Sequence, residues 1–178
     1  MSAKSRTLAI AWNAPYLGFA VFNGPQRLRV SGIRAVAKRS DDNDLSIHLQ
    51  DHIRRLIRRF SPSVIAINGT VKHTRFESAT LLRVVKEETS SGSIEVVTVK
   101  DEEIRSSFER FTEPTRFSMA AWATLFFPKL TAHFLRLQRK PQYLGLFDAV
   151  SLGIGYMSRF GDYQLTLSAA RERNSLHA

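Results

Sequence analysis

The chain has 178 residues, 43% of them hydrophobic and 24% charged, as in globular proteins with one sizeable core. No apolar run reaches the roughly 18 residues of a membrane-spanning helix, and the lack of cysteine excludes disulfides and thiolate metal sites. The formal net charge of +10 favours a polyanionic partner such as nucleic acid, although such an excess can also serve solubility alone. We expect a cytoplasmic protein without membrane contact.

The first part of the chain predicts an antiparallel meander of three strands. Residues 7–13 and 17–24 are short apolar runs, and residues 27–37 alternate apolar and polar side chains. The Asn-Gly-Pro sequence at 23–25 is a turn signal between the second and third strands. The polar segment 40–44 then predicts a loop that supplies capping residues for a helix.

The remaining sequence predicts alternating helices and strands, which is typical of a mixed sheet with helices on its faces. The helical segment 116–138 should bend at Pro128. We therefore expect an α/β fold with a mixed five-stranded sheet covered on both faces, in a single domain over residues 1–160, followed by a partly flexible tail over 161–178. The expected elements are a helix at 45–60, a strand at 63–68, a helix at 75–89, a strand at 94–99, and helices at 101–111, 116–138 and 147–159.

Three clusters of basic residues are candidate phosphate-binding sites. Few acidic residues interleave with the arginines of the predicted helix 45–60, so pairing within that helix cannot absorb their charge. A solvated helix face is the alternative interpretation. The clusters are Arg54, Arg55, Arg58 and Arg59; Lys72, His73 and Arg75; and Arg136, Arg139 and Lys140.

A pair of histidines also has metal-ligand spacing. His48 and His52 are four residues apart, so both lie on one face of the predicted helix, and zinc could use that spacing. No third ligand is evident in the sequence, and we therefore predict no metal site there.

The predicted helix 116–138 is apolar on more than one side. Trp122, Phe126, Phe127 and Phe134 follow helical spacing, which favours packing in the core or between subunits, with base stacking as the alternative. Packing against one neighbouring element cannot bury all of these apolar side chains, so the pattern predicts a partner protein. A second copy of the chain is the simplest such partner. We expect a homodimer.

The order of the elements and four short segments resemble the RuvC family of Holliday-junction resolvases, within the RNase H-like superfamily. The segments are Leu-Gly-Phe-Ala-Val at 17–21, Val-Ile-Ala-Ile at 64–67, Ser-Ala-Thr-Leu-Leu at 78–82 and Asp-Ala-Val-Ser-Leu at 148–152. The resemblance covers about residues 7–158, and it rests on the order and spacing of the segments.

The resemblance implies DNA cleavage with two divalent metal ions that four carboxylates hold. Carried over to this chain, the four acids fall at Ala11, Asn68, Gly145 and Asp148, so that only Asp148 is a carboxylate. Asp148 is then a relic metal ligand or, in the interpretation we favour, the N-cap of the last helix. The resemblance also implies a basic residue on a late helix. In this chain that residue is shifted: the matching stretch reads Arg-Phe-Ser at 116–118, and Arg116 is a further candidate nucleic-acid-binding residue.

The sequence therefore predicts a degenerate nuclease fold that has no catalytic residues and no cofactor. Its predicted function is non-catalytic binding of structured or branched nucleic acid, with DNA as the expected partner. Two alternatives stay open. One is a scaffold that binds proteins; the other is a nuclease with a rearranged Mg²⁺ site that uses Asp148, Glu77 and other acids.

Overall fold

The computed structural model describes residues 6–24, 27–36, 42–69, 75–90, 92–109 and 113–159. The strands are β1 (Arg6–Asn13), β2 (Tyr16–Asn23), β3 (Leu28–Ala35), β4 (Val64–Asn68) and β5 (Glu95–Val99). The helices are α1 (Asp42–Phe60), α2 (Arg75–Thr89), α3 (Asp101–Glu109), α4 (Arg116–Phe126), α5 (Thr131–Leu137) and α6 (Leu144–Arg159), with short 3₁₀ helices η1 (Pro128–Leu130) and η2 (Pro141–Tyr143).

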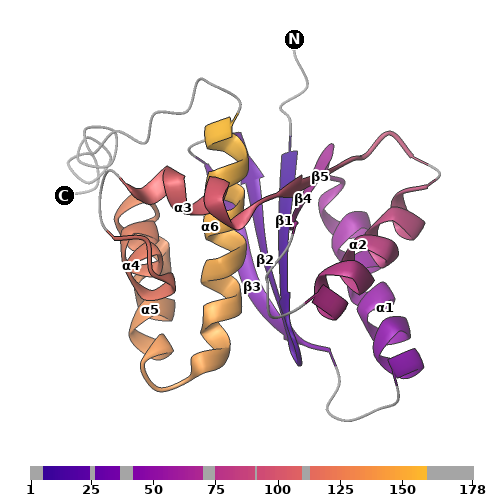
Figure 1. Ribbon diagram of the computed structural model, residues 1–178, viewed down its shortest axis with the longest axis horizontal. Coiled ribbons are helices and arrows are strands. Elements are labelled where there is room, and N and C mark those ends of the chain that lie inside the picture. Colours follow the sequence, from indigo (N-terminus) through magenta and orange to yellow (C-terminus); the bar gives the residue numbers. More distant parts are fainter. Residues whose placement is uncertain are drawn as a thin grey trace.

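The five strands form one mixed sheet in the order β3-β2-β1-β4-β5, which confirms the predicted sheet. The β1–β2 and β2–β3 pairs are antiparallel, whereas β4 is parallel to both β1 and β5. Figure 1 shows α1 and α2 on one face of the sheet and α6 on the other, with α4 and α5 outside α6. Because β1, β4 and β5 are parallel, their carboxyl ends meet at one edge of the sheet.

The two faces of the sheet have side chains of different size. On β1, Leu8 and Ile10 pack in the core under α1 and α2, whereas Ala9 and Ala11 belong to the core under α6. Small side chains on that second face let α6 approach the sheet closely. At the closest point a Cβ on Gly18 would lie 1.8 Å from the carbonyl oxygen of Gly145, so only glycine fits on β2 there.

Three helix boundaries differ from the sequence prediction. The last helix begins at Leu144, three residues earlier than predicted, and α1 begins at Asp42, inside the predicted polar loop. The predicted helix 116–138 is divided at Pro128, which opens a 3₁₀ turn because proline has no backbone N–H for the α-helical ladder. In the described parts of the chain, none of the helices combines the length and apolar character needed to cross a bilayer. The predicted tail lies outside the described residues.

Most apolar side chains of the α4 to α5 segment are part of the core, as the core-packing interpretation predicted. Phe126 and Phe127 are buried, and Trp122 and Phe134 pack against the same core. Three large apolar side chains of this segment are exposed, namely Phe117 at 50%, Leu125 at 50% and Leu135 at 63%. The unburied apolar surface is therefore smaller than the sequence pattern indicated.

Candidate functional site

A cavity of about 360 Å³ lies at the edge of the sheet where the parallel strands end. It contains three of the four positions at which the resemblance expected acids; the fourth, Gly145, is buried in the contact with β2. Arg116 also lines it. We call it the central cavity, and its lining residues are Ala11, Trp12, Asn13, Asn68, Ser78, Leu81, Asp101, Ile104, Arg105, Arg116, Met119, Asp148 and Ser151.

Asp101 is a second carboxylate in the central cavity, and the sequence analysis did not predict it. Asn68 is the last residue of β4, and Asp101 is the first residue of α3, two positions after β5 ends. The Asn68 amide Nδ2 donates a hydrogen bond to Asp101 Oδ1 at 2.8 Å. An acid directly after a strand that runs parallel to β4 was the available signal, because ligands of α/β sheets gather at the carboxyl ends of strands.

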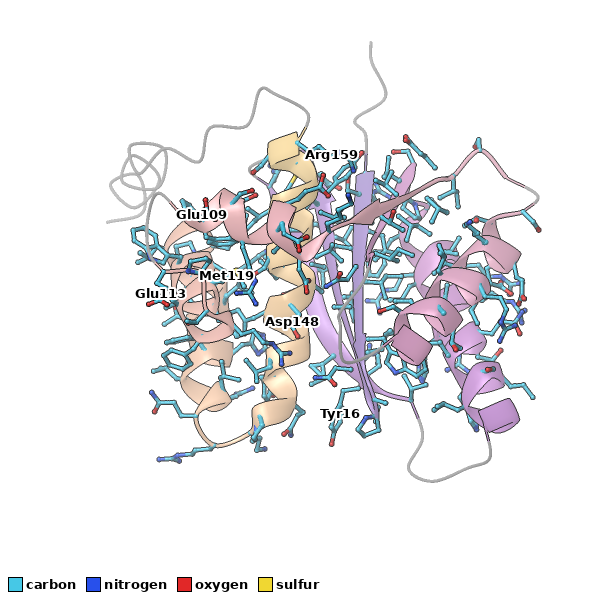
Figure 2. All side chains as sticks on the ribbon, viewed as in Figure 1. Tyr16, Glu109, Glu113, Met119, Asp148 and Arg159 are labelled. Carbon is cyan, nitrogen blue, oxygen red and sulfur yellow. The ribbon has the colours of Figure 1, made fainter. Side chains whose placement is uncertain are left out.

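Arg116 and Asp148 form a bidentate ion pair. Arg116 Nε donates to Asp148 Oδ1 at 3.0 Å, and Arg116 Nη2 donates to Oδ2. Asp148 is the fifth residue of α6, so the predicted N-cap role is wrong: the helix begins a full turn earlier. Figure 2 shows Asp148 on α6 and Met119 on α4, both on the side of the sheet away from α1 and α2.

The central cavity is balanced in charge. Its lining carries the carboxylates of Asp101 and Asp148 and the guanidinium groups of Arg105 and Arg116, which gives a formal sum of zero. Burial raises the pKa of the Asp148 carboxyl, and the nearby Asp101 adds to that rise, while Arg116 opposes it. The hydrogen bond to Asp148 raises the pKa of Arg116.

The residues of the central cavity do not fit a two-metal centre. Two adjacent divalent ions need several carboxylates to neutralise them, and Mg²⁺ prefers hard oxygen ligands. Here Ala11 has no donor atom, and both acids already accept hydrogen bonds from neighbouring nitrogen atoms. Within the ranges that the structure describes, no three His, Asp or Glu side chains group as metal ligands. The side chain of Glu77 is outside the described residues.

The predicted arginine ridge on α1 divides into a paired and an unpaired part. Arg54 forms an ion pair with Glu88 of α2 at 2.8 Å and lies 3.5 Å from Asp51, so its charge is largely compensated. Arg55, Arg58 and Arg59 are exposed and make no ion pair with any described residue.

A further arginine extends this surface. Arg34 of β3 lies over the ring of Phe19, 5.9 Å from its centroid. Burial lowers the pKa of His52, and the charges of Arg55 and Arg34 lower it further, so these two cations face the same imidazole. We call Arg34, Arg55, Arg58 and Arg59 the α1 basic surface. A cationic environment also disfavours a metal ion at the His48–His52 pair.

The other predicted basic residues are only partly described. Arg136, Arg139 and Lys140 are exposed and line a shallow hollow at the end of α5, apart from the central cavity. Lys72 and His73 lie outside the described residues, as does the side chain of Arg75. Of the predicted nucleic-acid-binding residues whose side chains the structure describes, only Arg116 lines the central cavity.

The fold is that of known Holliday junction resolvases. No protein-family model and no curated protein sequence matches the chain. Thermus thermophilus RuvC, solved with a Holliday junction substrate, is 15% identical at a TM-score of 0.62 over 88% of this chain and 96% of its own. A fowlpox virus resolvase bound to Holliday junction DNA is 12% identical at 0.58, over 88% and 99%. The yeast mitochondrial resolvase is 12% identical at 0.59, over 98% and 87%. The predicted resemblance and the RNase H-like fold are thereby confirmed.

Proposed function

We propose that this chain is a non-catalytic nucleic-acid-binding protein that recognises structured or branched DNA. The observation that carries the proposal is the Arg116–Asp148 ion pair, in which an internal cation occupies the one retained acid of the expected metal site. A guanidinium group balances the charge of a carboxylate but supplies no activated water or Lewis acid.

The proposed affinity comes from exposed cations. The whole chain has a net charge of +10, and the α1 basic surface and the cluster at the end of α5 together present several exposed basic side chains. Each phosphate contact releases counterions, so such surfaces bind DNA without bound metal. A central cavity of zero formal charge also repels a DNA backbone less than four carboxylates would.

A salt titration tests the binding half of the proposal. Binding of the full chain to a four-way junction, a duplex and a single strand is measured by fluorescence anisotropy at 50 to 300 mM salt. We expect the tightest binding to the junction and a steep fall of affinity with salt, because several phosphates are contacted. Equal, weak and salt-insensitive binding to all three would overturn the proposal.

The scaffold alternative is supported by the exposed apolar side chains on α4 and α5. Phe117 and Leu125 of α4 are each 50% exposed, and Leu135 of α5 is 63% exposed. This alternative predicts salt-insensitive binding of a protein partner and little affinity for DNA, so the same titration separates it from DNA binding.

We also propose that the same face of α4 joins two copies of the chain in a cytoplasmic homodimer. Leu125→Asp should shift the sedimentation of the protein from dimer to monomer, whereas Leu135→Asp on α5 serves as the matched control. A wild-type chain that sediments as a monomer at micromolar concentration would contradict the dimer.

The rearranged-nuclease alternative now has Asp101 as a further carboxylate near Asp148. It predicts metal-dependent cleavage that Asp148→Asn abolishes. The proposal of a non-catalytic protein predicts no cleavage by either form.

A further inference from the structure

The central cavity has the walls of a small-molecule pocket rather than those of a phosphate channel. Its volume of about 360 Å³ lies in the range of pockets that enclose organic ligands. Leu81, Ile104 and Met119 supply apolar wall, and the charged groups sum to zero. A phosphate gains little in such a place, whereas a neutral, flat group with polar edges fits it.

A buried donor in the wall lacks a partner. Trp12 lines the central cavity and is 9% exposed, and its indole Nε1 is buried without a hydrogen-bond acceptor among the described residues. Buried donors without partners are rare, because each costs part of its hydration. Because Trp12 lines the central cavity, its indole also offers an aromatic surface to a bound ligand.

Asp101 provides the matching acceptor. Its Oδ1 accepts from Asn68 at 2.8 Å, and its Oδ2 has no hydrogen-bond partner within the described residues. A carboxylate oxygen selects N–H donors, and the exocyclic amino groups of cytosine, adenine and guanine are such donors. Pockets for extruded bases combine hydrogen bonds to the base edge with aromatic and apolar walls.

We propose that the central cavity holds one unpaired nucleobase that carries an exocyclic amino group. The amino group donates to Asp101, and the base lies beside Trp12. This inference rests on the proposed function in that the base belongs to bound DNA, where bulges and branch points supply unpaired bases.

Nucleosides test the pocket without DNA. The chain has two tryptophans, so its ¹⁵N spectrum contains two indole N–H signals, and Trp12→Phe identifies the signal of Trp12. We expect deoxycytidine to shift the Trp12 signal and to leave the Trp122 signal in place. Thymidine, which lacks the amino group, should bind about tenfold more weakly. Asp101→Asn should weaken deoxycytidine by a similar factor, about tenfold. No shift, or equal shifts with both nucleosides, would overturn the inference.

DNA with a single bulge tests the same pocket in its proposed setting. A duplex with one bulged cytosine is compared with one that has a bulged thymine and with a fully paired duplex. We expect the wild type to prefer the cytosine bulge, and Asp101→Asn to lose that preference while it binds the paired duplex as before. Paired-duplex binding without either nucleoside binding or bulge preference would refute the pocket and leave the proposed function intact. Nucleoside binding without DNA binding would refute the proposed function and retain the pocket.

Discussion

The central cavity and the α1 basic surface use arginine in opposite ways. In the central cavity Arg116 is held by Asp148, and Arg105 Nη1 donates to the carbonyl oxygen of Pro114 at 3.4 Å. On the α1 basic surface, Arg55 and Arg58 are exposed and make no ion pair with the described residues. The difference indicates that the α1 basic surface has free positive charge for the proposed DNA binding, whereas the arginines of the cavity are engaged by neighbouring oxygen atoms.

The largest effect should follow from removing charge on the α1 basic surface. We expect Arg55, Arg58 and Arg59, all changed to Gln, to reduce junction affinity by one to two orders of magnitude at low salt and to lower the salt slope by about 2.7, because three phosphate contacts are lost. Changing Arg136, Arg139 and Lys140 to Gln removes the same charge from the second proposed DNA-binding cluster, so the two variants compare the clusters directly. Equal losses in both variants would show that net charge alone sets the affinity.

The next largest effect is expected on stability, when carboxylates are introduced at the three positions where the resemblance implied acids. Ala11→Asp, Asn68→Glu and Gly145→Asp together should lower the melting temperature, because like charges then gather in one place. Position 145 has room, since a Cβ there would meet nothing nearer than Gly18 N at 3.7 Å. Mn²⁺ at a hundredfold excess over its Kd should restore about 2.7 kcal/mol of stability. The melting temperature of the wild type should not respond to Mn²⁺; a rise in both proteins would contradict this expectation.

A smaller effect separates the paired from the unpaired arginine on α1. Arg54→Gln should lower the melting temperature and barely change DNA affinity, whereas Arg55→Gln should do the reverse. The hydrogen bond from Arg54 lowers the pKa of Glu88, so the stabilisation is present above the ordinary carboxyl pKa and is lost as pH falls through the lowered value. The deficit of Arg54→Gln should therefore disappear in acid. A deficit that persists at low pH would assign the loss to packing instead.

The smallest effect is the pH dependence of Asp148. Its raised pKa means that the folded state binds this proton more tightly than the unfolded state does. Stability is then lost as pH rises from the ordinary carboxyl pKa through the raised one. Asp148→Asn removes that dependence. The free energy of unfolding of the variant should therefore rise relative to that of the wild type as the pH increases from acid to neutral. Urea unfolding at each pH measures the difference, and a change of opposite sign would contradict the assignment.

The sheet could be predicted from the sequence because each of its strands has a local signal. Residues 64–67 form a continuous apolar run, and the turn at 23–25 separates two strands. The start of α6 could not be placed in this way. Gly145 reads as a helix breaker, yet it lies inside the helix, where its backbone is so near β2 that a Cβ on Gly18 would lie 1.8 Å from its carbonyl oxygen.

The sequence predicted only those features of the candidate site that depend on the residue type at a single position. The missing acids at Ala11, Asn68 and Gly145 follow from the segments that contain them. Asp101 is 33 residues from Asn68 in sequence, and the hydrogen bond between them depends on the adjacency of β4 and β5. The pairing of Arg54 likewise depends on Glu88 of a different helix, so the sequence alone overstated the basic ridge.

The most direct test of the account is incubation of the pure full-length chain with a labelled four-way junction and millimolar Mg²⁺ or Mn²⁺. The account predicts a bound junction that stays intact, with no difference between the wild type and Asp148→Asn. Metal-dependent strand cleavage by the wild type that Asp148→Asn abolishes would contradict it.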